Sequence, residues 1–209
     1  MDKNEYTMKG TATVVARTGD AGSRSTRRSA LRESRAQRID YAVGGCPEPA
    51  GAAGSLGVAL MAWSARGVCA ILVGADKALL EAELASYFPH ATLQEDGAAL
   101  GGLLADWWAF VADPSSGFNH ALDLGGTPLQ QQVWEALRSI PVGSTLTYSD
   151  LAARVGRPHA VRAVASACAA NRLAVVIPCH RVLGRSGSLT GYRWGIDRKR
   201  RLLDLEARG

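Results

Sequence analysis

Two apolar runs lie close together in the first half of the chain and predict a β-hairpin. Residues 56–64 (LGVALMAWS) and 67–74 (GVCAILVG) are each the length of a strand, and only Ala65 and Arg66 separate them. A helix capped by Asp76 is expected next, and it ends before a proline. These patterns predict a small α/β unit.

The same α/β unit is expected to contain a second helix over residues 97–111 and a short strand over residues 120–124 (HALDL). The pattern changes to helices at residue 124. Thr127 is a helix cap with Pro128 in the first turn and Gln130 at the third position after it. A Thr cap that is reciprocated by Gln is a frequent helix start.

Two short helices around a tight turn follow. Thr147 and Asp150 repeat the same capping pattern, and Gly156 ends that helix. Pro158 opens the next helix, over residues 159–170 (HAVRAVASACAA), and the connection Gly-Arg-Pro is typical of a helix-turn-helix. Its many alanines are compatible with close packing in a core or with close approach to nucleic acid.

The last segments surround a cysteine. Residues 172–178 (RLAVVIP) are expected to be extended and to place Cys179 at their end, before a glycine-rich loop over residues 184–195. Asp197 is expected to cap a final helix. The residues of that helix expected to face inward are Leu202, Leu203 and Leu205.

Composition narrows the class of protein. The chain has 209 residues, 47% of them hydrophobic, and a formal charge of +5. Positive charge is concentrated in residues 151–209, whereas residues 41–150 are acidic, so nucleic-acid binding and simple solubilising charge are both open. No apolar run long enough for a membrane span or signal region is present, and a cytoplasmic protein is expected. Residues 1–38 are polar and basic and predict a disordered tail.

The four cysteines lack the spacing of a metal site or of a disulfide framework. Cys69 and Cys168 lie in apolar runs and are expected to be buried, whereas Cys179 is followed by His180. A thiol with a pKa of about 8.5 needs a base to become a nucleophile. Neighbouring side chains on an extended strand point apart, so contact requires a turn at Pro178 or a bridging water. Glu206 is a candidate to orient the histidine.

Several motifs together resemble a known family. They are TYSDLA (residues 147–152), RAVASACAAN (162–171), IPCHRV (177–182), and GYRWG (191–195) with a later lysine, leucine pair and glutamate. This order resembles the O6-alkylguanine-DNA alkyltransferases, most strongly over residues 123–209. It reaches back more loosely to residue 39, toward the methyltransferase half of the bacterial Ada proteins.

The resemblance implies a fold and a domain arrangement. It implies an α/β domain over residues 39–122, with a small ribonuclease-H-like sheet and helices. An all-α, winged-helix-like domain with the helix-turn-helix would follow over residues 123–209. The zinc-binding and activator modules of Ada proteins have no counterpart here, so no role in transcription is expected.

The resemblance also implies roles for individual residues. Cys179 would accept the methyl group, His180 would take the thiol proton through a water molecule, and Glu206 would orient the histidine. Asn171 would brace the turn beside the nucleophile. Tyr148 would donate a proton to guanine N3 and lie against the flipped nucleotide.

DNA contacts follow from the same resemblance. Arg162 would fill the gap left by the flipped base, and the second helix of the helix-turn-helix would enter the minor groove. Trp194 would narrow the pocket and favour methyl over larger groups. Further DNA contacts would be Arg157, Ala163, Ser166, Ala167, Arg172, Arg185 and the cluster 198–201, for which solubilising charge is an equal alternative. The remaining pocket wall would be Val182, Tyr192 and Arg193.

The function implied is direct reversal of DNA damage. A monomer would flip O6-methylguanine out of double-stranded DNA and transfer the methyl group irreversibly to its own cysteine, once per molecule and without a cofactor or metal. O4-alkylthymine is a further candidate substrate. The alternatives are a lesion-binding relative without transfer, which would lack the acceptor cysteine, and a helix-turn-helix regulator.

Overall fold

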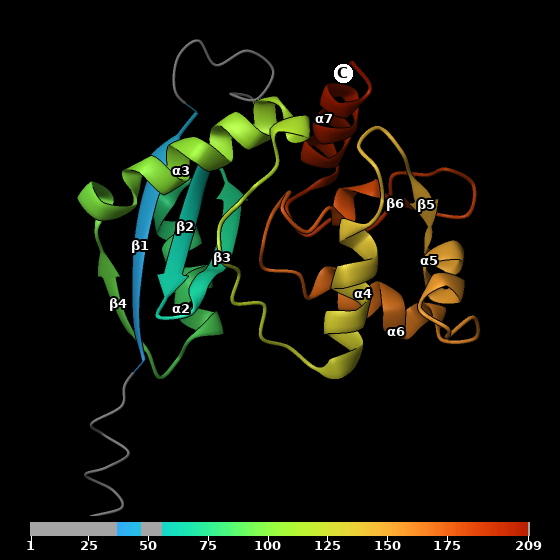
Figure 1. Cartoon of the computed structure of the whole chain (residues 1–209), viewed down its shortest axis with the longest axis horizontal. Coiled ribbons are helices and arrows are strands. Elements are labelled where there is room, and N and C mark those ends of the chain that lie inside the picture. Colours follow the sequence, from blue (N-terminus) through green and yellow to red (C-terminus); the bar gives the residue numbers. More distant parts are fainter. Residues whose placement is uncertain (1–36, 47–55, 209) are drawn as a thin grey trace, which may run out of the picture. The chain divides into compact units, whose positions relative to one another are not determined.

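The computed structural model describes residues 37–46 and 56–208, and every structural statement below concerns these residues. Contacts group Gln37–Gly209 into one compact unit. The expected tail lies outside the described residues except at its end, where Arg38 begins a strand. The elements are β1 (Arg38–Gly45), β2 (Val58–Ser64), β3 (Gly67–Gly74), α2 (Lys77–Tyr87), β4 (Thr92–Glu95), α3 (Gly97–Ala112), α4 (Pro128–Arg138), β5 (Leu146–Thr147), α5 (Tyr148–Arg154), α6 (Val161–Ala169), β6 (Val182–Leu183) and α7 (Ile196–Glu206) (Figure 1).

A four-stranded mixed sheet forms the first half of the unit, with strand order β3-β2-β1-β4. The predicted hairpin of β2 and β3 is confirmed, with Ser64 opposite Gly67 at its closed end. Strand β1 pairs antiparallel with β2 and parallel with β4. The short polar strand β4 was not predicted, because its residues TLQE show no apolar alternation.

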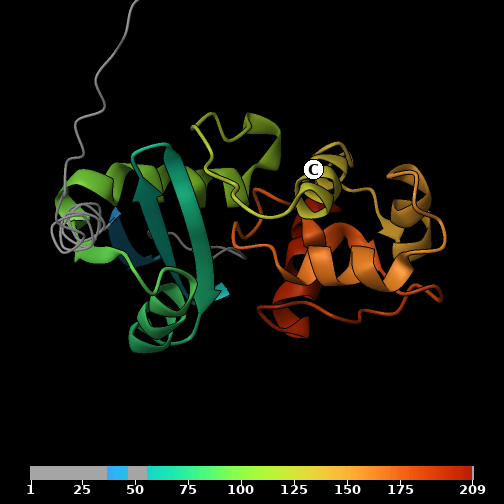
Figure 2. The same ribbon diagram turned by 90° about the horizontal axis from the view of Figure 1, so that it is seen from below.

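Helices α2 and α3 cover opposite faces of this sheet (Figure 2). The alternation along β2 explains this arrangement: Leu60 packs with Leu80 and Leu84 of α2, whereas Met61 packs with Trp107 of α3. Asp76 caps α2 as predicted, by accepting a hydrogen bond from the Leu79 amide.

Two of the predicted helix starts in the second half are confirmed. Thr127 with Gln130, and Thr147 with Asp150, each form a reciprocal capping box. Helix α6 begins at Val161, two residues later than expected, because the chain turns at Pro158 first.

Three other expectations are wrong. Residues 120–124 do not form a strand; Leu122 makes a single bridge to Val68. The segment 172–178 is not extended, since it turns after Leu173. The C-terminal half is not all-α, because β5 and β6 form a short parallel pair.

The free edge of β3 connects the sheet to the segment that carries Cys179. The Ile71 amide donates to the Arg172 carbonyl (2.7 Å), and the Ala174 amide donates to the Ile71 carbonyl (3.0 Å). One hydrophobic core runs through this junction, from Trp107 to α4, α6 and α7. A domain boundary at residues 122/123 therefore remains a prediction, while the sheet clearly fixes the cysteine segment.

Helix α7 differs from expectation at its start. Gly195, with φ 100°, is the residue before the helix, and Asp197 lies in the first turn without capping it. Leu202 is buried as predicted, whereas Leu203 and Leu205 are half-buried. Among the described residues, no helix is both long and apolar enough to cross a bilayer.

Candidate active site

Cys179 begins a single 3-10 turn, Cys179–Arg181, directly after Pro178. Cys179 is buried, with only 5% of its surface exposed, and its amide donates to the Ile177 carbonyl (2.8 Å). The turn that would bring neighbouring side chains to one side of the chain is therefore present.

Asn171 braces this turn from inside. Its Nδ2 donates to the Ile177 carbonyl (2.9 Å), the Leu173 carbonyl (3.3 Å) and Cys179 Sγ (3.3 Å). Its Oδ1 accepts from the Leu173 amide (2.8 Å), and the residue is buried. One side chain therefore fixes both ends of the loop and contacts the thiol, and its part in the reaction stays a prediction.

The loop between Asn171 and Cys179 is strained. Val175 has φ 68°, and it is the one residue other than glycine with positive φ among those described. A β-branched residue adopts this conformation only when its surroundings impose it. The Trp107 indole Nε1 donates to the Ala174 carbonyl (3.1 Å) and holds the loop from α3.

His180 and Glu206 form a buried pair. His180 Nε2 lies 2.8 Å from Glu206 Oε1, while His180 Nδ1 is buried and has no hydrogen-bond partner among the described residues. Burial lowers the pKa of His180, although its hydrogen bond to Glu206 opposes this. The imidazole is therefore neutral near pH 7.

Arg181 completes that pair and was not identified from the sequence. Its Nε donates to both oxygens of Glu206 (3.1 and 2.9 Å), its Nη2 donates to Oε1 (2.7 Å), and its Nη1 donates to the Ile140 carbonyl (2.6 Å). Burial would raise the pKa of Glu206, but the bonds from His180 and Arg181 lower it to about 2. The only sequence feature that could have pointed to Arg181 is its place in the motif IPCHRV.

Glu206 is therefore ionised at neutral pH and accepts from His180 Nε2–H. In the neutral ring, this leaves the lone pair on His180 Nδ1. The unpartnered nitrogen is thus the basic one.

Lys199 is a second buried cation near the site. It is fully buried, and its Nζ donates to the carbonyls of Val182 (2.5 Å) and Thr190 (3.0 Å). Burial lowers its pKa. The expectation that the whole cluster 198–201 contacts phosphates is wrong for this residue, since a side chain held inside cannot reach DNA.

The thiol itself is protonated in this environment. Burial raises the pKa of Cys179 to about 11, although the hydrogen bond from Asn171 and the charge of Lys199 act to lower it. A base is needed to generate a thiolate at neutral pH.

Aromatic side chains stand beside the histidine. Tyr192 packs edge-on to His180 (ring centroids 6.4 Å apart) and to Trp194 (5.3 Å). Tyr148 Oη donates to the Gly191 carbonyl (3.1 Å), and burial raises the pKa of this tyrosine to about 12. Of the expected pocket wall, Tyr192 and Trp194 lie together. Trp194 and Val182 are nearly fully buried.

The side chain of Arg193 is held against α2 and the end of α6. Its Nε donates to Glu83 Oε1 of α2 (2.9 Å) and its Nη1 to the Ala169 carbonyl (3.1 Å). Its guanidinium carbon lies 5.0 Å from the centre of the Tyr87 ring. A carboxylate and an aromatic face on α2 therefore hold the charged group, and a place for Arg193 in the pocket wall stays a prediction.

The expected DNA-contact residues divide into two groups. On α6, Arg162, Ala163 and Ser166 are exposed, but Ala167 is buried, so an exposed contact by Ala167 is ruled out. Arg172 is half-buried, with its guanidinium over the rings of Tyr87 (5.1 Å) and Phe88 (5.5 Å). The remaining exposed arginines of the expected set are Arg157, Arg185, Arg200 and Arg201.

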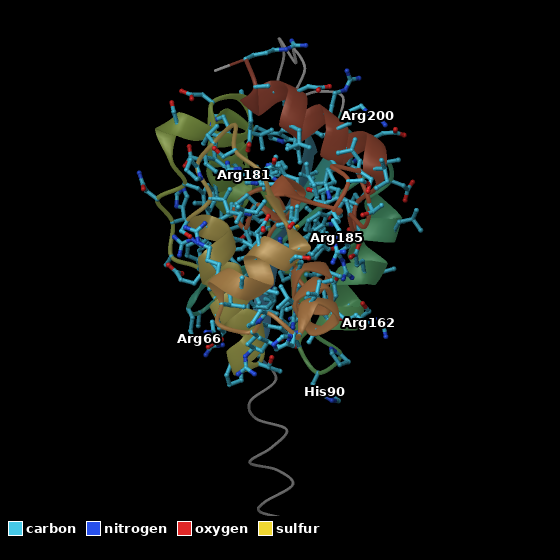
Figure 3. The ribbon with its side chains drawn as sticks, turned by 90° about the vertical axis from the view of Figure 1, so that its right-hand side faces the viewer. Arg66, His90, Arg162, Arg181, Arg185 and Arg200 are labelled. Carbon is cyan, nitrogen blue, oxygen red and sulfur yellow. The ribbon has the colours of Figure 1, made fainter. Side chains whose placement is uncertain are left out.

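Three of the exposed arginines gather along one side of the molecule. Arg162, Arg185 and Arg200 follow the same side of the face drawn in Figure 3, from α6 to α7. Arg66, in the turn between β2 and β3, lies on the other side of that view. A row of this kind can follow a phosphate backbone.

Comparison with known proteins assigns the family. Residues 128–208 match the model of the 6-O-methylguanine DNA methyltransferase, DNA binding domain. The chain is 46% identical over 169 residues to the bifunctional transcriptional activator/DNA repair enzyme Ada of Escherichia coli K12, covering 81% of this chain and 46% of Ada. The chain thus spans about half the length of the first curated relatives that it matches.

Two shorter relatives are covered over most of their length. The methylated-DNA–protein-cysteine methyltransferase of Mycolicibacterium paratuberculosis is 42% identical over 140 residues, 66% of this chain and 85% of that protein. The crystal structure of Mycobacterium tuberculosis OGT in complex with DNA superposes with a TM-score of 0.65 and 33% identity, covering 81% of this chain and 93% of that one. The protein therefore belongs to the family of methylated-DNA–protein-cysteine methyltransferases.

Proposed function

We propose that this protein repairs DNA by transferring the methyl group of O6-methylguanine to Cys179. The observation that carries the proposal is the contact of Asn171 with Cys179 Sγ (3.3 Å). The next residue, His180, is buried, and its Nε2 is hydrogen-bonded to Glu206. A protonated thiol, a neutral imidazole and an ionised carboxylate in sequence form a nucleophile, a base and an orienting group.

The proposed reaction begins with removal of the thiol proton. A water molecule between Cys179 and His180 Nδ1 would pass the proton to the imidazole, and Glu206 would stabilise the resulting cation. Lys199 favours the thiolate by its charge. The transfer uses no group other than the protein, a water molecule and the damaged base.

The bond changes balance without a cofactor. Sγ forms a bond to the methyl carbon while the bond between that carbon and guanine O6 breaks, and the electron pair moves into the base. Guanine N3 takes a proton, which the Tyr148 hydroxyl would donate after it leaves the Gly191 carbonyl. The product is a thioether that water does not cleave, so each molecule acts once.

Base flipping would make the methyl group accessible. A base inside a duplex has to leave the stack before its O6 substituent can be attacked, and a wedged side chain offsets part of the cost. Arg162, exposed near the start of α6, is proposed as that wedge. Ala163 and Ser166 would face the minor groove beside it, with Arg157 and Arg185 on phosphates.

Some finer expectations are retained as part of the proposal. The sheet would be ribonuclease-H-like and the second half winged-helix-like, with a boundary at residues 122/123. Tyr192 and Trp194 would line the guanine pocket and favour methyl over larger groups. The protein would act as a monomer in the cytoplasm.

The test is transfer from a duplex that carries one radiolabelled O6-methylguanine. We expect the protein to gain label and the mass of one methyl group, on the peptide that contains Cys179. Cys179→Ala should gain neither, whereas Cys69→Ala, which removes another buried thiol, should react as the wild type does. Label on Cys179→Ala would contradict the mechanism.

Two other functions are separated by the same samples. Tight lesion binding without any mass gain would indicate a binding-only relative, but such relatives lack the acceptor cysteine that is present here. A sequence-dependent footprint on undamaged DNA without transfer would indicate a regulator.

A further inference from the structure

Tyr87, near the C-terminal end of α2, lies between two arginines that come from the second half of the chain. The guanidinium carbons of Arg172 and Arg193 are 5.1 Å and 5.0 Å from the centre of its ring. Both arginines flank functional segments: Arg172 follows Asn171, and Arg193 follows Tyr192. An aromatic ring attracts cations at this distance.

Glu83, one turn earlier on α2, joins the same cluster. Its Oε1 accepts from Arg193 Nε (2.9 Å) and from Tyr87 Oη (2.6 Å). The side chains of Arg193 and Glu83 are about 30% and 28% exposed, so the ion pair is partly shielded from water. Arg193 also donates to the carbonyl of Ala169 at the end of α6 (3.1 Å).

These contacts act on the loop that carries Tyr192. Arg193 is the residue between Tyr192, whose ring meets His180, and Trp194, which is buried in the core. Because Arg193 is fixed on three sides, its neighbour Tyr192 has little freedom to leave His180. The charge of Arg193 acts to lower the pKa of Cys179, and the contacts of the cluster restrict the residue that packs against His180.

We propose that Glu83 and Tyr87 are positioning residues for methyl transfer, which act through Arg193 by holding Tyr192 beside His180. The proposal rests on the proposed function, since it concerns the rate of that transfer. Helix α2 thereby affects the transfer although none of the reacting side chains lies on it. Arg193 contributes by its bond to α2.

The experiment measures the transfer rate constant at saturating DNA and, in a Cys179→Ala background, the Kd for the same lesion duplex. Glu83→Gln keeps the size of the side chain but removes its charge, and we expect the rate constant to fall by about fivefold while Kd stays unchanged. Tyr87→Phe keeps the ring and should lose less than Tyr87→Leu. Glu81→Gln is the matched control, because Glu81 lies on the same helix but contacts Tyr41 and Lys77.

A double variant tests whether Glu83 acts through Arg193. If it does, Glu83→Gln with Arg193→Gln should be no slower than Arg193→Gln alone, because the second change removes nothing further. Multiplied effects, an unchanged rate in Glu83→Gln, or a change in Kd alone would each overturn the proposal. A wild-type protein that transfers no methyl group would instead overturn the proposed function.

Discussion

His180 Nε2 lies 2.8 Å from Glu206 Oε1, and both side chains are almost completely removed from water. Arg181 binds the same carboxylate, so Glu206 keeps its charge in spite of burial. The ionised carboxylate holds the proton of His180 on Nε2 and leaves Nδ1 basic. The tautomer that a general base requires is therefore set by two residues that need never touch the substrate.

The first prediction concerns pH. Because burial lowers the pKa of His180 below its ordinary value of 6.5, the ring stays neutral in the folded protein where a solvent-exposed histidine would be protonated. We expect the transfer rate to stay level as the pH falls from 7.5 through 6.5, and to decline only at lower pH. Single-turnover transfer measured across this range, with lesion DNA in excess, provides the test. A rate that halves at pH 6.5 would contradict a lowered pKa.

Stability should follow with a definite sign. Near and just below pH 6.5 the unfolded chain binds a proton at this histidine more fully than the folded chain does, so the free energy of unfolding decreases as the pH falls. Glu206 adds to this decrease at lower pH, because its contribution is present above its ordinary pKa of 4.5 and is lost toward about pH 2. Urea unfolding of the wild type and of His180→Gln should separate the contribution of His180 from that of Glu206, since the variant lacks the imidazole whose pKa burial lowers.

The second prediction concerns Asn171. Replacement by Ala removes hydrogen bonds to two carbonyls and to Cys179 Sγ, and we expect a loss of about 1–3 kcal/mol in the free energy of unfolding. The pKa of Cys179 should rise further above about 11, because the bond from Asn171 acts to lower it. Alkylation of Cys179 by iodoacetamide at fixed pH should therefore slow. Asn119→Ala, at an exposed position, is the control, and equal alkylation rates in the two variants would contradict the brace.

The elements that the sequence predicted well are those with local signals. The hairpin of β2 and β3 and both capping boxes depend on residues within a few positions of one another, and each is confirmed. Strand β4 has no such signal, because it is polar and is formed by pairing with β1. The turn of residues 174–176 was also missed, since an apolar run reads as a strand unless distant partners such as Trp107 bend it.

The same distinction applies to the candidate site. Motif order identified Cys179, His180 and Glu206, and the structure brings His180 and Glu206 together. Arg193 was assigned to the pocket because the loop of Tyr192, Arg193 and Trp194 resembles the pocket wall of the family. Glu83 and Tyr87, which hold its side chain, lie far away in the sequence. Long charged side chains choose among distant partners, and a short motif contains no information about them.

The third prediction concerns Tyr148. Phenylalanine at this position keeps the ring but removes the hydroxyl that donates to the Gly191 carbonyl. Gly191 has φ 61°, and a side chain on this residue would meet the Tyr148 hydroxyl. We expect the transfer rate constant at saturating DNA to fall about tenfold, because a proton donor to the leaving base is lost. Thermal melting should change little, since the hydrogen bond is at the edge of the site. Tyr41→Phe, which loses a comparable hydroxyl on β1, should transfer normally. An unchanged rate in Tyr148→Phe would remove the hydroxyl from the mechanism.

The fourth prediction separates base flipping from chemistry. Arg162 is exposed on α6, and none of the hydrogen bonds that fix the thiol, the histidine or the carboxylate involves it. Arg162→Ala should therefore slow transfer from a paired lesion by about tenfold or more, because a wedge that offsets the cost of unstacking is lost. Transfer from the free methylated base, which is already unstacked, should proceed at the wild-type rate.

The matched control is Arg138→Ala, since Arg138 is also an exposed arginine near a helix end but lies on α4 beside Glu135. Both variants lose one positive charge, so a general electrostatic effect on DNA binding would slow them equally and would weaken with added salt in both. A wedge gives a different pattern: only Arg162→Ala is slow, only on duplex DNA, and less so when the lesion is opposite a mismatched base that is easier to extrude. Equal rates for Arg162→Ala on paired and mismatched lesions would assign the arginine to phosphate binding instead.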